Sequence, residues 1–287
     1  MHRPIVPPEE FPATLLRAGV ARQESMAGMP APTIVLLHGQ PDSSASFWAL
    51  RQALHEHVPG ARVLVPDRPG YGANPHRAAD FAGNLAWLRG WLQANVDAPV
   101  WLVGHSWAGG LAVLAAAEAP ELVHGVVLMS SIGPHCLLPI DHLLAAPVLG
   151  AWLSFTILEL GKPAITRKAA RLIIGRQADR DQPYARAVGW AMRYRPVWRS
   201  FLTEQRALVA QLGQLNTQLS RIRRPVLILS GSQDRLIPDS TAQELAGSIR
   251  DAHRLVLEGG HDLQLRQPDS VARAIATFVT GSNRQSS

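Results

Sequence analysis

Ser106 lies in a segment whose neighbours would make its hydroxyl group reactive. The segment Gly104-His105-Ser106-Trp107-Ala108 joins an apolar run to a helical pattern. A serine hydroxyl is a weak nucleophile unless it is exposed and next to a base, and a sharp strand-to-helix turn exposes it. Such a turn accepts only small residues two positions before and two positions after the serine, and Gly104 and Ala108 are small. This pattern is typical of a nucleophile elbow, so we predict that Ser106 is a nucleophile.

An aspartate and a histidine later in the chain provide the other groups that such a serine needs. Asp234 follows the apolar run Val226–Leu229, and His261 stands in a glycine turn after the run Arg254–Leu257. Loops at the carboxyl ends of parallel strands meet at one rim, so we expect both side chains beside Ser106. There His261 would act as general base, because its pKa is near working pH. Asp234 would hold the imidazole tautomer and stabilise its charged form. The order Ser, Asp, His fits this assignment. The alternatives are that Asp234 only caps its loop and that His261 is an ordinary histidine.

Two backbone amides are candidates for binding the negative oxygen that forms when a serine attacks a carbonyl group. The first is the amide of Gln40, in His38-Gly39-Gln40-Pro41, which follows the apolar run Thr33–Leu37. The second is the amide of Trp107, which the expected turn leaves at a helix N-terminus, where an anion is stabilised. An ordinary Gly-Pro turn is the alternative explanation of the first segment.

Short buried strands and amphipathic helices alternate along the chain and would position these residues. The strand-like runs lack polar alternation, as expected when both faces of a sheet are covered. Their alternation with helices predicts an α/β fold with a mostly parallel central sheet and helices on both faces. The expected strands are Thr33–Leu37, Arg62–Val65, Val100–Val103, Gly125–Met129, Val226–Leu229 and Arg254–Leu257, with a short edge strand at Leu15–Gln23. The expected helices are about Ala45–His57, Asp80–Ala94, Trp107–Ala119, Ser240–Ser248 and Asp269–Val279.

The alternation stops between about residues 133 and 222, where only helical patterns occur. We therefore predict a helical cap, 133–222, inserted into a core formed by 1–132 and 223–287. Its basic second half indicates either a solvated face or a site for an anionic group. We expect apolar side chains of the cap to line an acyl pocket together with Trp107, or else to pack in the core. These residues are Leu137, Leu138, Leu143, Leu144, Leu149, Trp152, Leu153 and Phe155.

Composition limits the classes of function. The chain has 287 residues, of which 47 % are hydrophobic and 17 % charged, so a large core is available. The net charge is +6, but no nucleic-acid motif accompanies it, and we expect no nucleic-acid partner. The single cysteine, Cys136, excludes an intramolecular disulfide and a cysteine-based metal cluster.

Membrane segments are not expected either. Leu143–Leu158 is uncharged but shorter than the about 20 residues of a spanning helix. The first residues contain no apolar run of signal-peptide length. We expect a cytoplasmic protein with little membrane contact, and the sequence leaves its oligomeric state open.

Together these motifs resemble the α/β-hydrolase superfamily, in its capped branch of haloperoxidases and epoxide hydrolases. The resemblance runs from Thr33 to Val279 and includes Asp67-Arg68-Pro69-Gly70-Tyr71-Gly72, a segment that is structural in the family. It implies the α/β-hydrolase fold and a Ser106-Asp234-His261 triad. Related dehalogenases and epoxide hydrolases carry an aspartate nucleophile followed by tryptophan. Here Trp107 is present, but Ser106 takes the nucleophile position.

A serine aided by histidine suits acyl transfer, so we predict an esterase that works through an acyl-enzyme intermediate. The expected partner is a small hydrophobic acyl substrate, and neither a metal nor an organic cofactor is needed. A thioesterase, a carbon–carbon bond hydrolase and a cofactor-free haloperoxidase or perhydrolase remain alternatives on the same triad. A ligand-binding or cyclase-like protein with this fold is an alternative of another class.

Overall fold

Successive apolar residues of each central strand face opposite sides of one sheet. In β1 (Thr33–Leu37), Val35 and Leu37 pack into one hydrophobic cluster, while Ile34 and Leu36 pack into the other. The computed structural model of the protein describes residues 31–160 and 197–283. The expected strand at Leu15–Gln23 lies outside these residues, as does most of the basic half of the predicted cap.

Six parallel strands form the sheet, in the order β2-β1-β3-β4-β5-β6. The other five are β2 (Arg62–Leu64), β3 (Val100–His105), β4 (Val123–Met129), β5 (Val226–Gly231) and β6 (Ala252–Leu257). The prediction of a parallel sheet is confirmed. β3 and β5 run two residues beyond their apolar runs, because pairing with the neighbouring strand continues to His105 and to Gly231.

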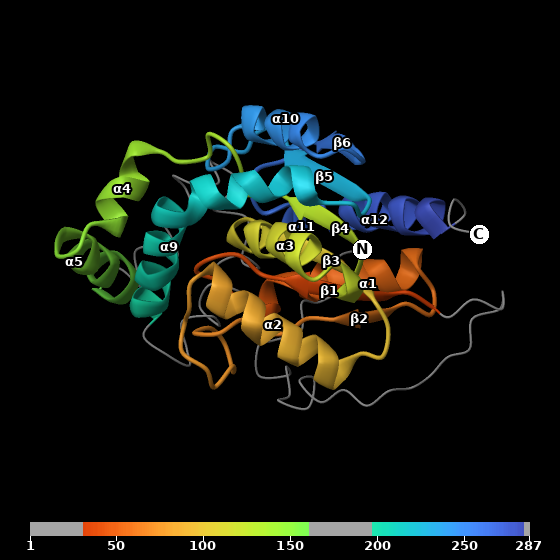
Figure 1. The fold of residues 1–287 in the computed structure, drawn as a ribbon, viewed down its shortest axis with the longest axis horizontal. Helices are drawn as coiled ribbons and strands as arrows, with labels where there is room; N and C mark the ends of the chain where they lie inside the picture. Colours follow the sequence, from red (N-terminus) through yellow and green to blue (C-terminus); the bar gives the residue numbers. More distant parts are fainter. Residues whose placement is uncertain (1–30, 161–196, 284–287) are drawn as a thin grey trace, which may run out of the picture.

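Helices cover both faces of this sheet, as predicted (Figure 1). One face carries α2 (Phe81–Asn95), α3 (Trp107–Glu118), α9 (Val197–Gln218) and α10 (Asp239–Ser248), whose apolar residues share one cluster. The other face carries α1 (Trp48–His57), α11 (Leu263–Arg266) and α12 (Pro268–Asn283). The helix expected from Ala45 is divided into a 3-10 turn, η3 (Ser44–Phe47), and α1; further 3-10 turns are η4 (Pro120–Leu122) and η8 (Leu219–Arg221).

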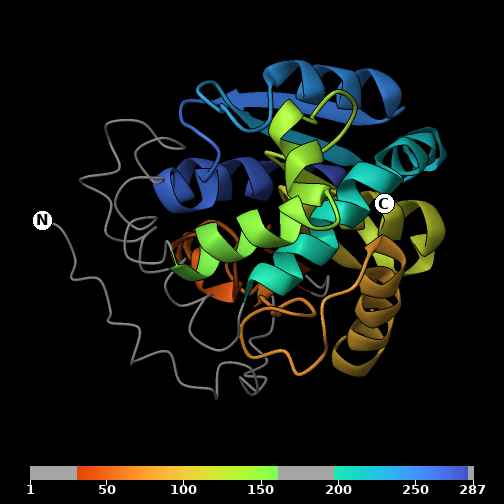
Figure 2. The same ribbon diagram turned by 90° about the vertical axis from the view of Figure 1, so that its left-hand side faces the viewer.

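Between β4 and β5, the described part of the predicted cap contains helices and no strand. It comprises α4 (Pro139–Ala145), α5 (Leu149–Phe155), the π-helical turn η5 (Thr156–Leu160), the whole of α9 and η8. Figure 2 looks at this end of the molecule and shows α4, α5 and α9 in front of the sheet.

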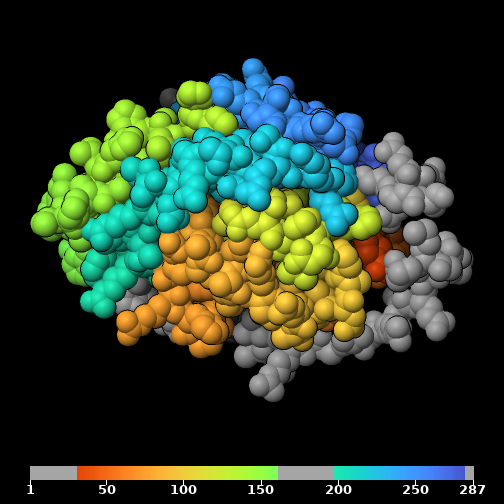
Figure 3. Space-filling view, viewed as in Figure 1, coloured from red at the N-terminus to blue at the C-terminus, as the bar shows by residue number. Residues whose placement is uncertain are grey.

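α9 extends from this end of the molecule to the core. Its 22 residues correspond to about 33 Å of helix measured along its axis. At its start, Val197, Trp198 and Phe201 pack with Leu158 of η5. Further along, its apolar residues join the core cluster beside α3. In the space-filling view, the teal-to-cyan surface of α9 runs without a break from the green surface of α4 and α5 toward α10 (Figure 3).

In the described ranges, no single helix is both long and apolar enough to cross a membrane. The pair Pro139–Ala145 and Leu149–Leu160 meets the length and composition test only when joined, and it is bent by 97°.

Candidate active site

Ser106 occupies a strained turn between β3 and α3. Its φ of 54° and ψ of −122° lie where residues with a side chain are seldom found. The turn is held at both sides of the serine, since the Ser106 amide donates to Met129 O (3.0 Å) and the Ile132 amide donates to Ser106 O (3.2 Å). A Cβ atom at Gly104 would lie 2.5 Å from Ala108 O. This close approach explains why a small residue is needed before the serine.

The loop after β1 passes directly over this turn. A Cβ atom at Gly39 would lie 2.9 Å from Ser106 Cβ and 3.2 Å from His105 Nδ1. The loop therefore brings Gln40 to the nucleophile, and the Gln40–Pro41 peptide bond is cis. Trp107 is the first residue of α3, and an amide at that position has no acceptor within its own helix. The two expected oxyanion donors are thus the residue after Gly39, which lies against Ser106, and the residue after Ser106 itself; their role stays a prediction.

Asp234 and His261 are joined by a hydrogen bond. His261 Nδ1 donates to Asp234 Oδ2 at 2.9 Å, and both side chains are buried. The other carboxylate oxygen of Asp234 accepts the amides of Leu236 (2.9 Å) and Ile237 (3.0 Å). The two loops meet at glycines, because a Cβ atom at Gly231 would lie 2.4 Å from Gly260 O. The hydrogen bond to Asp234 fixes the orientation of the imidazole ring and leaves Nε2 as the ring nitrogen that could accept a proton.

Electrostatics favour a charged Asp234 beside a basic imidazole. Burial opposes charge on Asp234, but His261 and the hydrogen bonds outweigh it, so the pKa of Asp234 lies below its ordinary value. Burial alone would lower the pKa of His261. The Asp234 carboxylate, its hydrogen bond and the nearby Asp262 and Asp42 outweigh burial and raise the pKa of His261 above its ordinary value. An imidazolium formed during a reaction is therefore stabilised at this position.

His105 connects the elbow to the histidine loop. Its ring lies 4.9 Å from that of His261, and its Nε2 is 3.1 Å from His261 O. Burial and the neighbouring His261 lower the pKa of His105 to about 3. Since His105 is neutral at working pH, its Nε2 donates to that carbonyl oxygen. It holds the loop without adding a second positive charge.

Sequence reasoning missed two acidic residues near His261. Asp262 is buried, and burial raises its pKa. Loss of hydration raises the pKa of Asp42 to about 7, although part of the residue stays exposed. Asp262 directly follows His261, and Asp42 lies two residues after Gln40. These positions next to candidate site residues could have indicated both.

The structure places the Trp107 indole differently from the sequence expectation. The indole is fully buried and stacks on Phe81, with a centroid distance of 4.1 Å. It therefore packs in the interior, beneath the elbow, and does not border an open pocket. Only the Trp107 amide remains a candidate group of the site.

The other expected pocket residues divide into two groups. Leu137, Leu138, Leu144 and Leu153 are partly buried, and Leu137 packs against the core. Leu143, Leu149, Trp152 and Phe155 are exposed, with Trp152 at 62 %. None of the eight lines either of the two cavities described below. Within the part of the chain that the structure describes, no group of three or more His, Cys, Asp or Glu residues could hold a metal ion.

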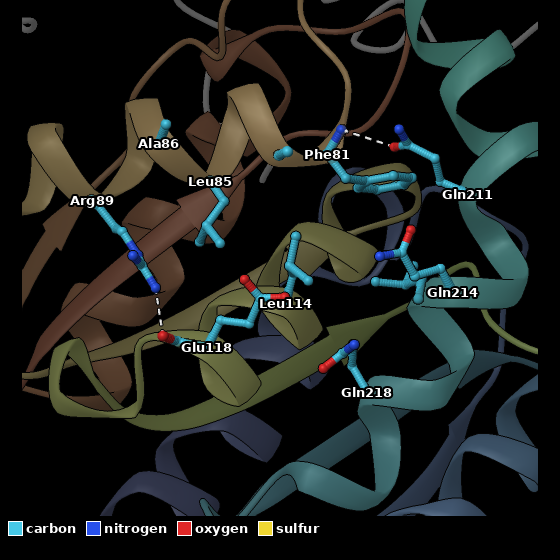
Figure 4. A pocket seen from close by; sticks show the side chains of 11 residues that line it. Phe81, Leu85, Ala86, Arg89, Leu114, Glu118, Gln211, Gln214 and Gln218 are labelled. Carbon is cyan, nitrogen blue, oxygen red and sulfur yellow. Dashed lines mark hydrogen bonds between the residues drawn. The ribbon is translucent and has the colours of Figure 1, made fainter.

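Two cavities described in the structure are lined by none of Ser106, Asp234 and His261. One, of about 310 Å³, lies between α2, α3 and α9 and is lined by Phe81, Leu114 and Gln211 among others (Figure 4). Leu114 is eight residues beyond Ser106 in α3, or about 12 Å along the helix. The other, of about 540 Å³, lies between β6 and α12. We assign neither to the acyl substrate.

Replacing Gly39 by alanine should damage the site without unfolding the protein. The added methyl group would press on Ser106 and displace the loop by a few tenths of an ångström. We expect kcat for an ester to fall about 10²–10³-fold, as when one oxyanion donor is lost. The measurement is steady-state hydrolysis of a short ester, with thermal unfolding recorded alongside.

Gly90→Ala is the matched control, because a Cβ atom at Gly90 in α2 meets nothing within 4 Å. This change should leave kcat unaltered and raise stability by about 0.5–1 kcal/mol. A Gly39→Ala variant with kcat within threefold of wild type would contradict the close approach of loop and nucleophile.

Comparison with known proteins agrees with this architecture. A family model described as the alpha/beta hydrolase fold matches residues 32–268. A haloalkane dehalogenase from Mesorhizobium japonicum is 27 % identical over 88 % of this chain and 86 % of that protein. A pimeloyl-[acyl-carrier protein] methyl ester esterase from Stenotrophomonas maltophilia is 26 % identical over 86 % of this chain and 93 % of that protein. The crystal structure of a bromoperoxidase from Bacillus anthracis covers 87 % of this chain and 92 % of its own, with a TM-score of 0.71 and 20 % identity.

The fold and these matches define the class of protein: the chain belongs to the α/β-hydrolase fold family. Its relatives include proteins named as dehalogenase, esterase and depolymerase.

Proposed function

We propose that this protein is a serine hydrolase that cleaves a hydrophobic carboxylic ester, or a related acyl compound, through an acyl-enzyme intermediate. The observation that carries the proposal is the strained conformation of Ser106 together with the buried His261–Asp234 pair, whose loop is bonded to His105, the residue before Ser106. A positive φ alone does not single out Ser106, because Ser130 also has one. Ser106 differs in its close contact with Gly39 and in the hydrogen bond between the preceding His105 and the His261 loop. The ligand-binding alternative gives no role to this combination.

In the proposed reaction, Ser106 Oγ attacks the acyl carbon and its proton passes to His261 Nε2. The amides of Gln40 and Trp107 hold the oxygen that becomes negative. The tetrahedral intermediate then expels the alcohol, which takes the proton from His261. Water, activated by the same imidazole, attacks the acyl-enzyme, and the carboxylic acid leaves with Ser106 restored. Asp234 stays ionised throughout and stabilises the imidazolium.

The nucleophile argues for acyl transfer over dehalogenation, although one relative is named a dehalogenase. An aspartate can displace a halide and form an ester that water then hydrolyses. A neutral serine is a poorer nucleophile toward an alkyl halide and suits a carbonyl carbon, where the oxyanion donors can act. The relative named a methyl ester esterase supports this choice.

Hydrolysis of a thioester, hydrolysis of a carbon–carbon bond and perhydrolysis are the alternative reactions for the same three residues. Exposed apolar cap residues such as Leu149 and Phe155 favour hydrophobic acyl chains over sugars or peptides. A panel that pairs each ester with its thioester, over several acyl lengths, separates ester from thioester hydrolysis by kcat/KM.

The experiment that tests the proposal is intact-mass analysis after treatment with a fluorophosphonate probe. We expect one adduct on the wild-type protein and none on Ser106→Ala. Ser130→Ala is the matched control, because Ser130 also follows a central strand, at a φ of 44°, and it should still react. Absence of an adduct on folded wild-type protein would contradict the proposal.

A further inference from the structure

Two adjacent residues of α9 are linked to the loop that carries Gln40: Glu204 through Arg68 and Gln205 directly. Both are buried, at 0 % and 2 % exposure. Buried polar side chains are retained where they are hydrogen-bonded, and here their partners include the groups proposed to surround the oxyanion.

Gln205 orients the Gln40 side chain through a directed chain of hydrogen bonds. A carboxylate only accepts hydrogen bonds, so Gln205 Nε2 donates to Asp141 Oδ1 in α4 (2.8 Å). Gln205 Oε1 is then the acceptor for Gln40 Nε2 at 2.9 Å. Asp141 itself is fixed by the Leu138 amide, which donates to its Oδ2 at 2.7 Å. The charge on Asp141 thus sets the orientation of both glutamines.

Glu204 holds the same loop through Arg68. The guanidinium group of Arg68 is fully buried and forms an ion pair with the Glu204 carboxylate. It also donates from Nε to His38 O and from Nη2 to Gly39 O, each at 2.7 Å. Tyr71 Oη donates to Glu204 Oε2 at 2.7 Å. The carbonyl groups of the two residues that precede Gln40 are therefore anchored to α9.

The second proposed oxyanion donor is tied to the same turn of α9. The Trp107 indole Nε1 donates to the backbone oxygen of Glu204 at 3.2 Å. The Arg68 guanidinium lies 4.6 Å from the centroid of the Trp107 ring. One helical turn of α9 therefore bonds both to Gln40 of the oxyanion loop and to Trp107, the residue after Ser106.

We propose that Glu204 and Gln205 are positioning residues that set the oxyanion loop against Ser106. The inference rests on the proposed function, because it takes the Gln40 and Trp107 amides as oxyanion donors. A small displacement of such a donor weakens transition-state binding more than substrate binding. The placement of α9 therefore controls kcat.

Gln205→Leu tests the proposal, with Gln211→Leu as its matched control. Gln211 lies on the same helix and also binds the core, accepting from the Phe81 amide and donating to Asp80. Within the described residues, its hydrogen bonds go to α2 and Asp80 and not to the oxyanion loop. We expect Gln205→Leu to lower kcat by up to about 10²-fold with KM within twofold. Gln211→Leu should leave both constants near the wild-type values.

Gln40→Ala removes the same hydrogen bond from the other side and keeps the backbone amide. It should lower kcat to a similar extent, and it stands in for Gln205→Leu if that variant does not fold. In the double variant the two losses should not add, since both break one contact. Additive losses, or equal effects of Gln205→Leu and Gln211→Leu on kcat, would overturn the positioning role.

The outcomes separate this proposal from the proposed function. If wild-type protein shows no Ser106-dependent ester hydrolysis, the proposed function fails and the positioning role fails with it. If wild-type protein hydrolyses esters and Gln205→Leu keeps the wild-type kcat, only the positioning role fails.

Discussion

Ser106→Ala and His261→Gln should each lower kcat for ester hydrolysis about 10⁶-fold, and the double variant should lose no more than either alone. The serine is reactive only while the imidazole accepts its proton, and the imidazole has no task without the serine. Removal of either group therefore stops the same step. The residual rate would come from the two oxyanion amides and from substrate binding.

The measurement is kcat with an activated ester, using protein free of contaminating esterases. Ser130→Ala serves as the control for the loss of a serine at positive φ near the strand ends, and it should keep kcat within a fewfold of wild type. Losses that multiply in the double variant would mean that Ser106 and His261 act independently.

Asp234→Asn should lower kcat/KM about 10⁴-fold and move the acidic limb of the pH profile to lower pH. The base must be neutral, so activity is lost as pH falls through the pKa of His261. In the wild-type protein that pKa is raised above its ordinary value, chiefly by Asp234 acting against burial. Without the carboxylate charge, burial lowers the pKa of His261. The acidic limb of the pH profile therefore moves to lower pH.

The profile is measured as kcat/KM between about pH 5 and 9 for both proteins. Asp42→Asn identifies the titrating group, because the pKa of Asp42 is about 7 and falls in the same range. We expect the limb to persist in Asp42→Asn, shifted slightly to lower pH as one negative neighbour of His261 is removed. If the limb disappears in Asp42→Asn, or stays in place in Asp234→Asn, it does not report His261.

Local spacing made the sheet and the elbow predictable. The apolar runs found all six described strands. β1, β3, β4 and β5 are almost wholly buried, so apolar residues dominate them, whereas most residues of β6 are exposed and only its apolar run Leu255–Leu257 indicated it. Gly104 and Ala108 marked the turn at Ser106, because the requirement for small residues acts over only five positions. Asp234 and His261 could be proposed from their places after β5 and β6, since parallel strands end at one rim.

Contacts between distant residues could not be predicted in this way. Arg68 and Glu204 are 136 positions apart, and Gln40 and Gln205 are 165 apart. α9 carries no motif that indicates its partners. The same limit applies to Trp152, whose helix was expected to face a pocket. Sequence identifies an apolar helix, but the faces that become buried depend on which elements pack against it.

The continuity of α9 limits how this protein could be re-engineered. Its first turns hold α4 and α5, and its later residues Leu212 and Leu215 fill the core. If the cap of another protein replaced this region up to the end of α9, the exchange would also replace part of the hydrophobic core. One residue inserted between Gln205 and Gln211 would rotate the two halves by about 100° relative to each other. A chimera should therefore keep α9 whole and vary in length only on the N-terminal side of it.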